Sequence, residues 1–292
     1  AEQEKLRNAR VAIVGMGGGG GIYLATLTRM GVGRFNVADF DTFSLANINR
    51  QYGAMNSTIG RRKTEVMAEI ARDIHPGVQI NEFGDGIGPH NIDAFLDEVD
   101  VVVDALDLFA QPARLLLYQA ARKKRIPVLT GAVLGLSATV GGFAPDGMTF
   151  ESYFDITEDM EPFEILARFV VGLAPRGRHW SYMDSSRVAP EDQTGPSSAA
   201  AIALLAGMVC PEVLVAILNR RSLNVAPNYT QYDPYLKRFW TGKLRWGNRG
   251  PLQRLKLWLI ARRFAARKDV FNRVSFQHMP DGTTDTTRRP KP

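Results

Sequence analysis

The sequence predicts an α/β fold: a doubly wound, mostly parallel sheet, a β-rich continuation and a basic C-terminal extension. The first observation is that short β-branched runs alternate with helical stretches through residues 1–140, starting from VAIVG at 11–15. Such alternation is typical of a parallel sheet covered by helices on both faces. The second is a charge split, with 19 Lys and Arg against 26 Asp and Glu in residues 1–218, but 17 against 4 in residues 219–292. These patterns predict a main domain at 1–218 and an extension at 219–292.

The predicted elements of the main domain follow one another in a regular order. A Gly-rich turn after the first strand leads into a helix at 22–30, and a GVG sequence separates this helix from the next strand. The further elements are a strand at 34–39, a helix at 60–74 closed by His75-Pro76, a strand at 78–83, a helix at 92–98, a strand at 100–104, a helix at 112–125 and a strand at 128–131. The order predicts a Rossmann-like core at about 1–140.

The rest of the chain has a different texture. We expect short strands at 137–156, a loop or crossover at 172–196, and one or two buried helices at 197–218. The last segment has nearly the length of a membrane span, but Pro211 and Glu212 interrupt it, so we interpret it as part of a core. Beyond it we expect a helix at 251–268 with apolar residues in two stripes, which does not favour binding to a membrane surface, and a disordered tail.

Composition limits the class of protein. The chain has 292 residues, 45% hydrophobic and 23% charged, which is ordinary for a globular protein. Cys210 is the single cysteine, so the sequence has neither an internal disulfide nor a zinc site of paired cysteines. One cysteine and a polar N-terminus that does not read as a secretory signal predict a reducing, cytoplasmic location.

The Gly-rich turn between the first strand and helix predicts a phosphate-binding site. Gly15, Gly17 and Gly20 fit the dinucleotide fingerprint, in which the backbone and the N-terminus of the helix approach a phosphate. Asp39 ends the second strand 24 residues after Gly15, near the place expected for a ribose. The turn by itself does not decide which nucleotide binds.

A set of polar residues beyond Asp39 favours a triphosphate. Asp41 and Asn47 are followed by Arg50 and Lys63, and a triphosphate needs such cations to neutralise its charge and its leaving pyrophosphate. Asp107 stands just beyond the fourth strand, where a carboxylate can bind a metal ion that bridges phosphates. We therefore predict Arg50, Lys63 and Asp107 as catalytic, and Asp41 and Asn47 as further nucleotide contacts.

A series of motifs runs through the first half of the chain. In order, the motifs are VAIVGMGGGGG, DFDTFSLANINRQ, GRRKTEVM and VVVDALD, followed by Arg114 and IPVLTG. Together they resemble the ThiF/MoeB-type, ubiquitin-activating-enzyme-like adenylyltransferases. The resemblance implies that residues 1–218 form an ATP-binding adenylation domain, with Gly18 against the nucleotide and Asp39 on its ribose. It also implies that Arg50 and Lys63 contact the phosphates and that Asp107 binds magnesium. The implied enzyme is a homodimer that adenylates the C-terminal carboxylate of a ubiquitin-like protein or peptide and releases pyrophosphate.

The chain also departs from this family. Many members carry a catalytic cysteine in the crossover loop, but residues 172–196 contain none, and Cys210 lies in an apolar stretch where an inert, buried thiol is expected. We therefore expect adenylation without a catalytic cysteine. Two alternatives stay open: a tRNA-modifying relative that activates a nucleoside carboxylate and binds RNA through the basic extension, and a non-catalytic nucleotide- or peptide-binding module.

Overall fold

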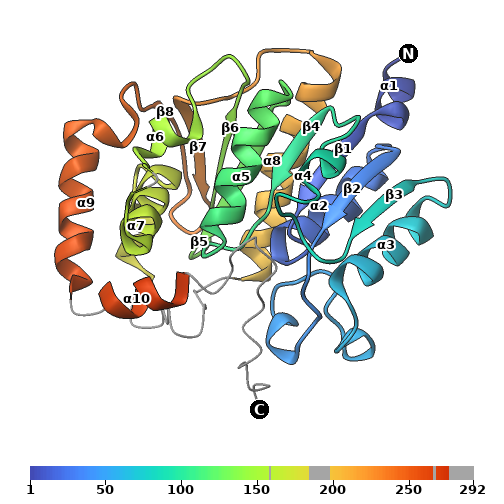
Figure 1. Cartoon of the computed structure of the whole chain (residues 1–292), viewed down its shortest axis with the longest axis horizontal. Helices are drawn as coiled ribbons and strands as arrows, with labels where there is room; N and C mark the ends of the chain where they lie inside the picture. The colour runs from blue at the N-terminus through green and yellow to red at the C-terminus, as the bar shows by residue number, and fades with distance from the viewer. Residues whose placement is uncertain (158, 184–197, 266–267, 276–292) are drawn as a thin grey trace.

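The computed structural model describes all residues except 158, 184–197, 266–267 and 276–292 (Figure 1). Its centre is one mixed sheet of eight strands in the order β3-β2-β1-β4-β5-β6-β7-β8. The α/β class with a mostly parallel first half is confirmed. The predicted disordered tail and most of the predicted crossover loop lie outside the described residues.

The parallel half of the sheet contains the predicted strands. Its members are β1 (Arg10–Val14), β2 (Arg34–Ala38), β3 (Gln79–Phe83), β4 (Val101–Asp104) and β5 (Val128–Leu134). β1 lies between β2 and β4 and is buried throughout, since Val11 and Ile13 join the core on one face while Ala12 and Val14 join the core on the other. All five strands therefore end at the same edge of the sheet.

Helices cover both faces of this half (Figure 1). One face carries α1 (Glu2–Asn8), α2 (Gly18–Arg29), α3 (Lys63–Ile74) and α8 (Ala199–Leu218), and the other carries α4 (Ile92–Phe95) and α5 (Gln111–Lys123). Two predicted starts were wrong: α2 begins at Gly18 rather than at 22, and α3 begins at Lys63 rather than at 60. Four glycines open α2 despite their low helix propensity, because the turn is tightly packed: a side chain at Gly18 would press on Ile202 of α8, and one at Gly20 would collide with the carbonyl of Gly15.

α8 is a single helix that contains Pro211. Among the described residues it is the one helix with the length and hydropathy of a membrane span, a test that the core helix of a globular protein also passes. Its Leu205, Val209 and Val213 lie in the core against the sheet. The prediction of a buried helix is therefore confirmed.

The antiparallel half differs from the β-rich expectation. β6 (Ser137–Phe143) is one of the expected short strands and pairs antiparallel with β5, but the following residues form α6 (Phe150–Phe154) and α7 (Pro162–Leu173). The prediction of strands as far as 156 was wrong, because an aromatic cluster of Phe143, Phe150 and Phe154 packs a helix on the sheet there. The predicted loop at 172–196 includes the end of α7 and a 3-10 helix, η3 (Arg178–Ser181), with residues 184–196 outside the description.

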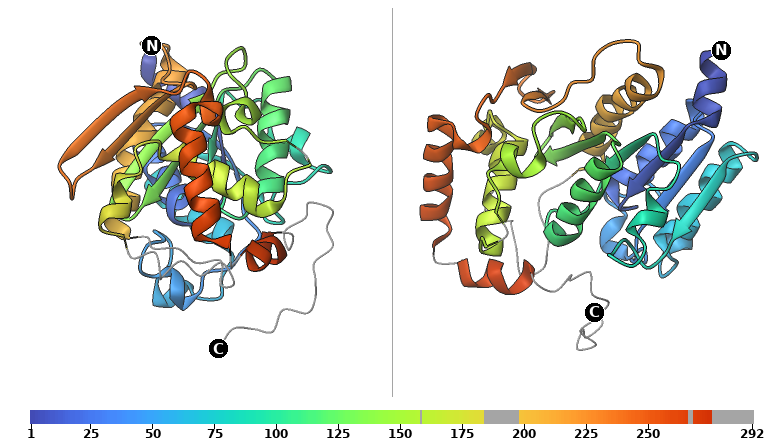
Figure 2. Two further views of the ribbon diagram at one scale, coloured as in Figure 1. Left: turned by 90° about the vertical axis from the view of Figure 1, so that its left-hand side faces the viewer. Right: turned by 45° about the horizontal axis from the view of Figure 1, so that its top comes forward.

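The basic extension continues the same sheet. β7 (Asn228–Asp233) pairs with β6, and β8 (Arg238–Lys243) pairs with β7 and forms the edge (Figure 2). The single helix predicted at 251–268 is instead α9 (Pro251–Arg263) followed by α10 (Lys268–Ser275), both next to α7. One stripe of α9 faces α7, whereas the other, which includes Leu255 and Leu259, is exposed.

Candidate active site

A cavity of about 390 Å³ lies at the carboxyl ends of the parallel strands, and we call it the central cavity. Its lining includes eight of the ten predicted site residues: Gly15, Gly17, Gly18, Asp39, Asp41, Arg50, Lys63 and Asp107. These residues come from the segments that follow β1, β2 and β4, from the starts of α2 and α3, and, for Arg50, from the loop between β2 and α3. Gly20 and Asn47 do not line it.

The Gly-rich turn forms one wall of the central cavity. Gly15 has a φ of 90°, and a side chain there would collide with the carbonyl of Ala105. A side chain at Gly20 would collide with the carbonyl of Gly15, so Gly20 allows the turn to close rather than contacting a ligand. Gly17 caps α2 without a side-chain hydrogen bond, which leaves the first N–H groups of the helix for an anion.

Asp39 is held rigidly at the end of β2. Its Oδ2 accepts a hydrogen bond of 2.6 Å from the N–H of Met16, and its Oδ1 accepts one of 2.8 Å from the N–H of Asp41. Burial raises the pKa of the Asp39 carboxyl, while the Lys63 ammonium opposes that rise. The carboxylate thus joins the Gly-rich turn to the loop that carries Asp41, in a place where it can accept hydrogen bonds from hydroxyls.

Lys63 and Asp41 form an ion pair in the same wall. The Lys63 ammonium lies 2.9 Å from Oδ2 of Asp41, and the side chain of Lys63 is 7% exposed whereas that of Asp41 is 50% exposed. The N–H of Lys63 also donates to the carbonyl of Asp41. These two contacts fix a cation at the first residue of α3, so its position is set before any ligand binds.

Arg50 and Asn47 have different roles in their loop. Nη1 of Arg50 donates to the carbonyl of Ala46 at 3.0 Å and to Oδ1 of Asn49 at 2.9 Å, and no ion pair of Arg50 occurs within the described residues. Its positive charge is therefore available to a ligand in the central cavity. Asn47 instead accepts a hydrogen bond from the N–H of Ser44 and closes the 3-10 helix η1 (Leu45–Asn47). Asn47 does not line the central cavity and its Oδ1 is used by the backbone, so its assignment as a nucleotide contact stays a prediction.

Asp104 and Asp107 differ sharply in environment. Asp104 is buried, and its Oδ2 accepts hydrogen bonds from Arg114 at 2.8 Å and Tyr118 at 3.1 Å. Asp107 is exposed to the central cavity and accepts one described hydrogen bond, from the N–H of Phe109 to Oδ1. Its carboxylate can therefore bind a cation, whereas that of Asp104 is already neutralised.

The protein supplies few ligands of its own for a metal. No group of three or more His, Cys, Asp or Glu side chains close enough to hold an ion occurs in the described part of the chain. Magnesium commonly binds one or two carboxylates and completes its shell with substrate phosphates and water. Asp107 fits that arrangement, which needs a phosphate ligand in the cavity.

Two lining residues with unsatisfied polar atoms were not assigned a role from the sequence. Nη1 of Arg114 and Oε1 of Gln51 are buried and have no hydrogen-bond partner among the described residues. Arg114 lies with its guanidinium 4.4 Å from the ring centroid of Phe169, and Gln51 lies beside Gly17. Buried polar atoms of this kind are costly unless a ligand or water satisfies them.

The far side of the central cavity is apolar and was missed. It is formed by α7, α9 and residues near η3, among them Phe163, Leu166, Phe169, Val170, Trp180 and Ile260. The amphipathic spacing of 162–173, with Pro162 at the first helical position, was the signal that could have revealed α7. The cavity thus joins a charged half at the sheet to an apolar half at α7.

Cys210 lies outside this cavity. It is buried in α8, and burial raises the pKa of its thiol to about 12. A thiol in that state is protonated at neutral pH and is a poor nucleophile. The prediction of a buried core thiol is confirmed.

Comparison with known proteins finds a family match and several relatives. The model of the ThiF family matches residues 1–249. A tRNA threonylcarbamoyladenosine dehydratase of Haemophilus influenzae is 37% identical over 129 residues, which are 44% of this chain and 49% of that protein. A SAMP-activating enzyme E1 of Haloferax volcanii is 32% identical over 152 residues, which are 52% of this chain and 56% of that protein. The chain spans about half the length of the curated relatives it matches.

Solved structures share the fold over most of the chain. The crystal structure of Escherichia coli MccB with ATP superposes with a TM-score of 0.60 at 19% identity, over 86% of this chain and 66% of that one. At this identity the likeness concerns the fold.

Proposed function

The chain belongs to the ThiF family of adenylyltransferases, and on that premise we propose that it uses ATP and magnesium to attach AMP to a carboxylate. The single observation that carries the proposal is the convergence of the Gly-rich turn, Asp39, Arg50, Lys63 and Asp107 on one cavity. A triphosphate nucleotide needs a carboxylate that binds its ribose, cations that bind its phosphates and a carboxylate that binds its metal ion. Asp39, the pair Arg50 and Lys63, and Asp107 supply these groups in the proposal. A site without catalytic function would not need this arrangement of charges.

In the proposed reaction a carboxylate oxygen of the substrate attacks the α-phosphorus of ATP. A new C(O)O–P bond forms, the bond from the α-phosphorus to the bridging oxygen of the β-phosphate breaks, and pyrophosphate leaves with the electron pair. Arg50 and Lys63 stabilise the charge that develops on the leaving phosphates, and the N–H groups at the start of α2 hold phosphate oxygens. Asp39 orients the nucleotide by accepting hydrogen bonds from its ribose.

Asp107 is the residue proposed to hold magnesium. The ion would supply charge neutralisation on the phosphates, as it does in other phosphoryl and nucleotidyl transfers. Arg114 positions this region, because its Nη2 donates to the backbone carbonyls of Leu106 and Asp107 at 2.8 and 3.2 Å. The loop that carries Asp107 is therefore tied to a buried cation.

We propose the C-terminal carboxylate of a ubiquitin-like protein or peptide as the substrate. The support is the apolar half of the central cavity, since side chains such as Leu166 and Val170 suit the aliphatic part of a peptide. The SAMP-activating enzyme E1 is a relative whose name describes a protein substrate. The sequence contains no cysteine besides Cys210, so the acyl-adenylate would pass directly to an acceptor nucleophile.

A nucleoside carboxylate is the second candidate substrate. It is favoured by the excess of cations in residues 219–292, and by a relative named as a tRNA threonylcarbamoyladenosine dehydratase. A homodimer in the cytoplasm also belongs to the proposal, on the basis of the family resemblance and the single cysteine.

Calorimetry and isotope exchange test the proposal. ATP should bind, more tightly with magnesium than without it, and exchange of labelled pyrophosphate into ATP should appear only when a suitable carboxylate is present. Peptides with free and amidated C-termini, and tRNA transcripts, distinguish the two substrate classes. Tight binding of NAD with no detectable binding of ATP would exclude the proposed activity.

A further inference from the structure

A second cavity of about 440 Å³ lies between the edge of the sheet and the N-terminus of α9, and we call it the basic cavity. Five cations line it: Arg176, Arg178, Lys243, Arg245 and Lys256. They come from three separate segments, namely the residues after α7, the end of β8 and the body of α9. No Asp or Glu occurs in its described lining.

The cations of the basic cavity differ from other surface cations in having no acidic partner. Elsewhere Arg61 pairs with Glu69, and Arg125 pairs with Asp146. By contrast, the side chains of Arg176, Arg178, Lys243 and Arg245 make no hydrogen bond or ion pair within the described residues. Like charges that converge without a counter-charge repel each other, and an anion in the cavity would remove that cost.

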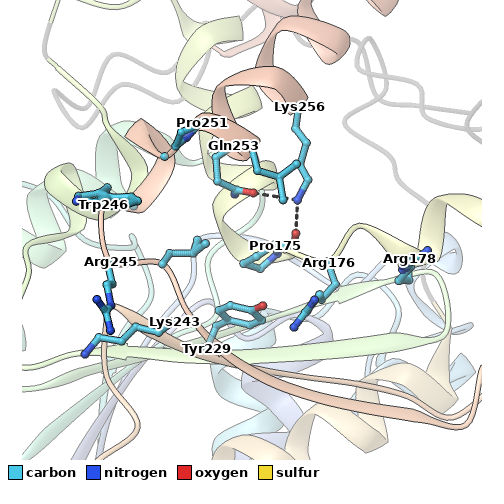
Figure 3. A pocket seen from close by; sticks show the side chains of 14 residues that line it. Pro175, Arg176, Arg178, Tyr229, Lys243, Arg245, Trp246, Pro251, Gln253 and Lys256 are labelled. Carbon is cyan, nitrogen blue, oxygen red and sulfur yellow. Dashed lines mark hydrogen bonds between the residues drawn. The ribbon is translucent and has the colours of Figure 1, made fainter.

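Lys256 is the least exposed of the five cations. Its ammonium donates to the carbonyl of Pro175 and, at 2.9 Å, to Oε1 of Gln253 (Figure 3). Burial, and then the nearby charges of Arg176 and Arg178, lower the pKa of this ammonium. The group is thus held by neutral carbonyl oxygens and not by an anion of the protein.

The uncharged lining is also suited to an anion. Tyr229 is 93% buried, since 7% of its surface is exposed, and its hydroxyl has no hydrogen-bond partner among the described residues. Its ring lies across Gly242, its partner in the β7–β8 register, where any side chain would collide with the hydroxyl. Figure 3 shows this ring between Arg176 and the Lys243–Arg245 pair. α9 adds the N–H groups of its first turn, which starts at Pro251.

We propose that the basic cavity is a second anion-binding site, separate from the central cavity, which binds the phosphate groups of a phosphorylated ligand. The cavity combines several cations from separate elements with an unpartnered hydroxyl and the start of a helix. This combination suits a ligand that carries more than one phosphate group. The same phosphate chemistry occurs in a free phosphorylated small molecule and in the backbone of RNA. Trp246, which is 67% exposed at the rim, offers a surface on which a base can stack.

The two cavities have no lining residue in common. Arg176 and Arg178 face the basic cavity, whereas Trp180 and Met183 of the same segment line the central cavity. None of the cations of the basic cavity belongs to the proposed adenylation machinery. The site can therefore be tested independently of catalysis.

Three variants separate the possible sites. The first is Arg176→Ala/Arg178→Ala/Arg245→Ala, which removes three of the five cations that line the basic cavity. The matched control is Lys237→Ala/Arg238→Ala/Arg254→Ala, which removes the same charge from exposed positions outside that cavity. The third is Arg50→Ala/Lys63→Ala, which damages the central cavity alone.

The probes are inorganic tripolyphosphate, a short single-stranded RNA and a poly-glutamate peptide. We expect tripolyphosphate still to bind the Arg50/Lys63 variant. Its affinity for the basic cavity should fall at least about tenfold in the basic-cavity variant and should change little in the control variant. A change in tryptophan fluorescence should be lost in Trp246→Phe. If RNA is the source, its salt slope should fall by about 2 in the basic-cavity variant, from about 0.7 per lost phosphate contact. Tripolyphosphate binding without RNA binding indicates a small ligand.

Three results would overturn the proposal. The first is equal weakening by the control, which would show a general surface charge. The second is complete loss of tripolyphosphate binding in the Arg50/Lys63 variant, which would show that phosphate binds only in the central cavity. The third is a preference for poly-glutamate, which would show a carboxylate-bearing ligand. Pyrophosphate exchange, measured on the same variants, reports separately on the proposed adenylation.

Discussion

Nε of Arg114 lies 2.8 Å from Oδ2 of Asp104, and both side chains are almost fully buried, at 3% and 0% exposed. Tyr118 donates to the same carboxylate oxygen, and the guanidinium of Arg114 lies over the ring of Phe169. The pair therefore joins the end of β4 to α5 and α7 at the boundary between the charged and apolar halves of the central cavity. Three elements depend on it for their relative positions.

We expect Arg114→Ala to destabilise the protein by about 3–5 kcal/mol, because it leaves the Asp104 carboxylate buried without a cation. Urea unfolding measures this change. The matched control is Arg125→Ala, which breaks an ion pair of similar length, 2.7 Å, whose side chains are 71% and 73% exposed. The control should cost under about 1 kcal/mol. Equal losses in both variants would show that burial of the pair has no effect.

We expect Asp107→Ala to lower the rate of adenylation by about 10²-fold or more while the protein stays folded, because the carboxylate acts on charge at the phosphates and not through packing. Pyrophosphate exchange and thermal unfolding check the two parts. Asp85→Ala is a control, since Asp85 is also exposed but does not line the central cavity. Unchanged exchange in Asp107→Ala would contradict its proposed role.

Cys210→Ala should retain adenylation, because the thiol is buried in α8, outside the central cavity. The loss of packing should cost about 1 kcal/mol in unfolding free energy. Activity of the purified variant, and mass spectrometry of the wild type after reaction with substrate, check this. Detection of an acyl thioester on Cys210 would show that the helix opens to the cavity.

His179 should make stability depend on pH. Its ring nitrogens are buried without hydrogen-bond partners among the described residues, and burial lowers its pKa from 6.5 to about 4. Between about pH 6.5 and pH 4 the His179 side chain is therefore protonated in the unfolded chain but neutral in the folded chain. The free energy of unfolding falls as the pH drops through this range, and it becomes constant below about pH 4. The full effect is about 3 kcal/mol. Denaturant unfolding of wild type and His179→Phe across this range should show a weaker dependence in the variant; parallel curves would refute the assignment.

The charged half of the central cavity could be predicted because its residues stand next to elements that the local sequence pattern identifies. Gly15, Asp39 and Asp107 each stand just beyond a β-branched strand, and the carboxyl ends of parallel strands must meet at one edge. Asn47 shows the limit of that reasoning. Its place in the chain suggested a nucleotide contact, but the N–H of Ser44 takes its side-chain oxygen, and such a choice depends on local backbone geometry.

The sequence by itself determined the alternation of strands and helices in the first half, the burial of Cys210 and most of the polar residues that line the charged half of the central cavity. These properties depend on periodicity and on neighbours close along the chain. Only the tertiary structure decided that β7 and β8 continue the sheet, that α7 and α9 close the central cavity, and that Arg176 and Arg245 face one basic cavity. The physical reason is that pairing across a sheet edge, and charges brought together from distant segments, are fixed by the packing of the whole chain. No local pattern encodes them.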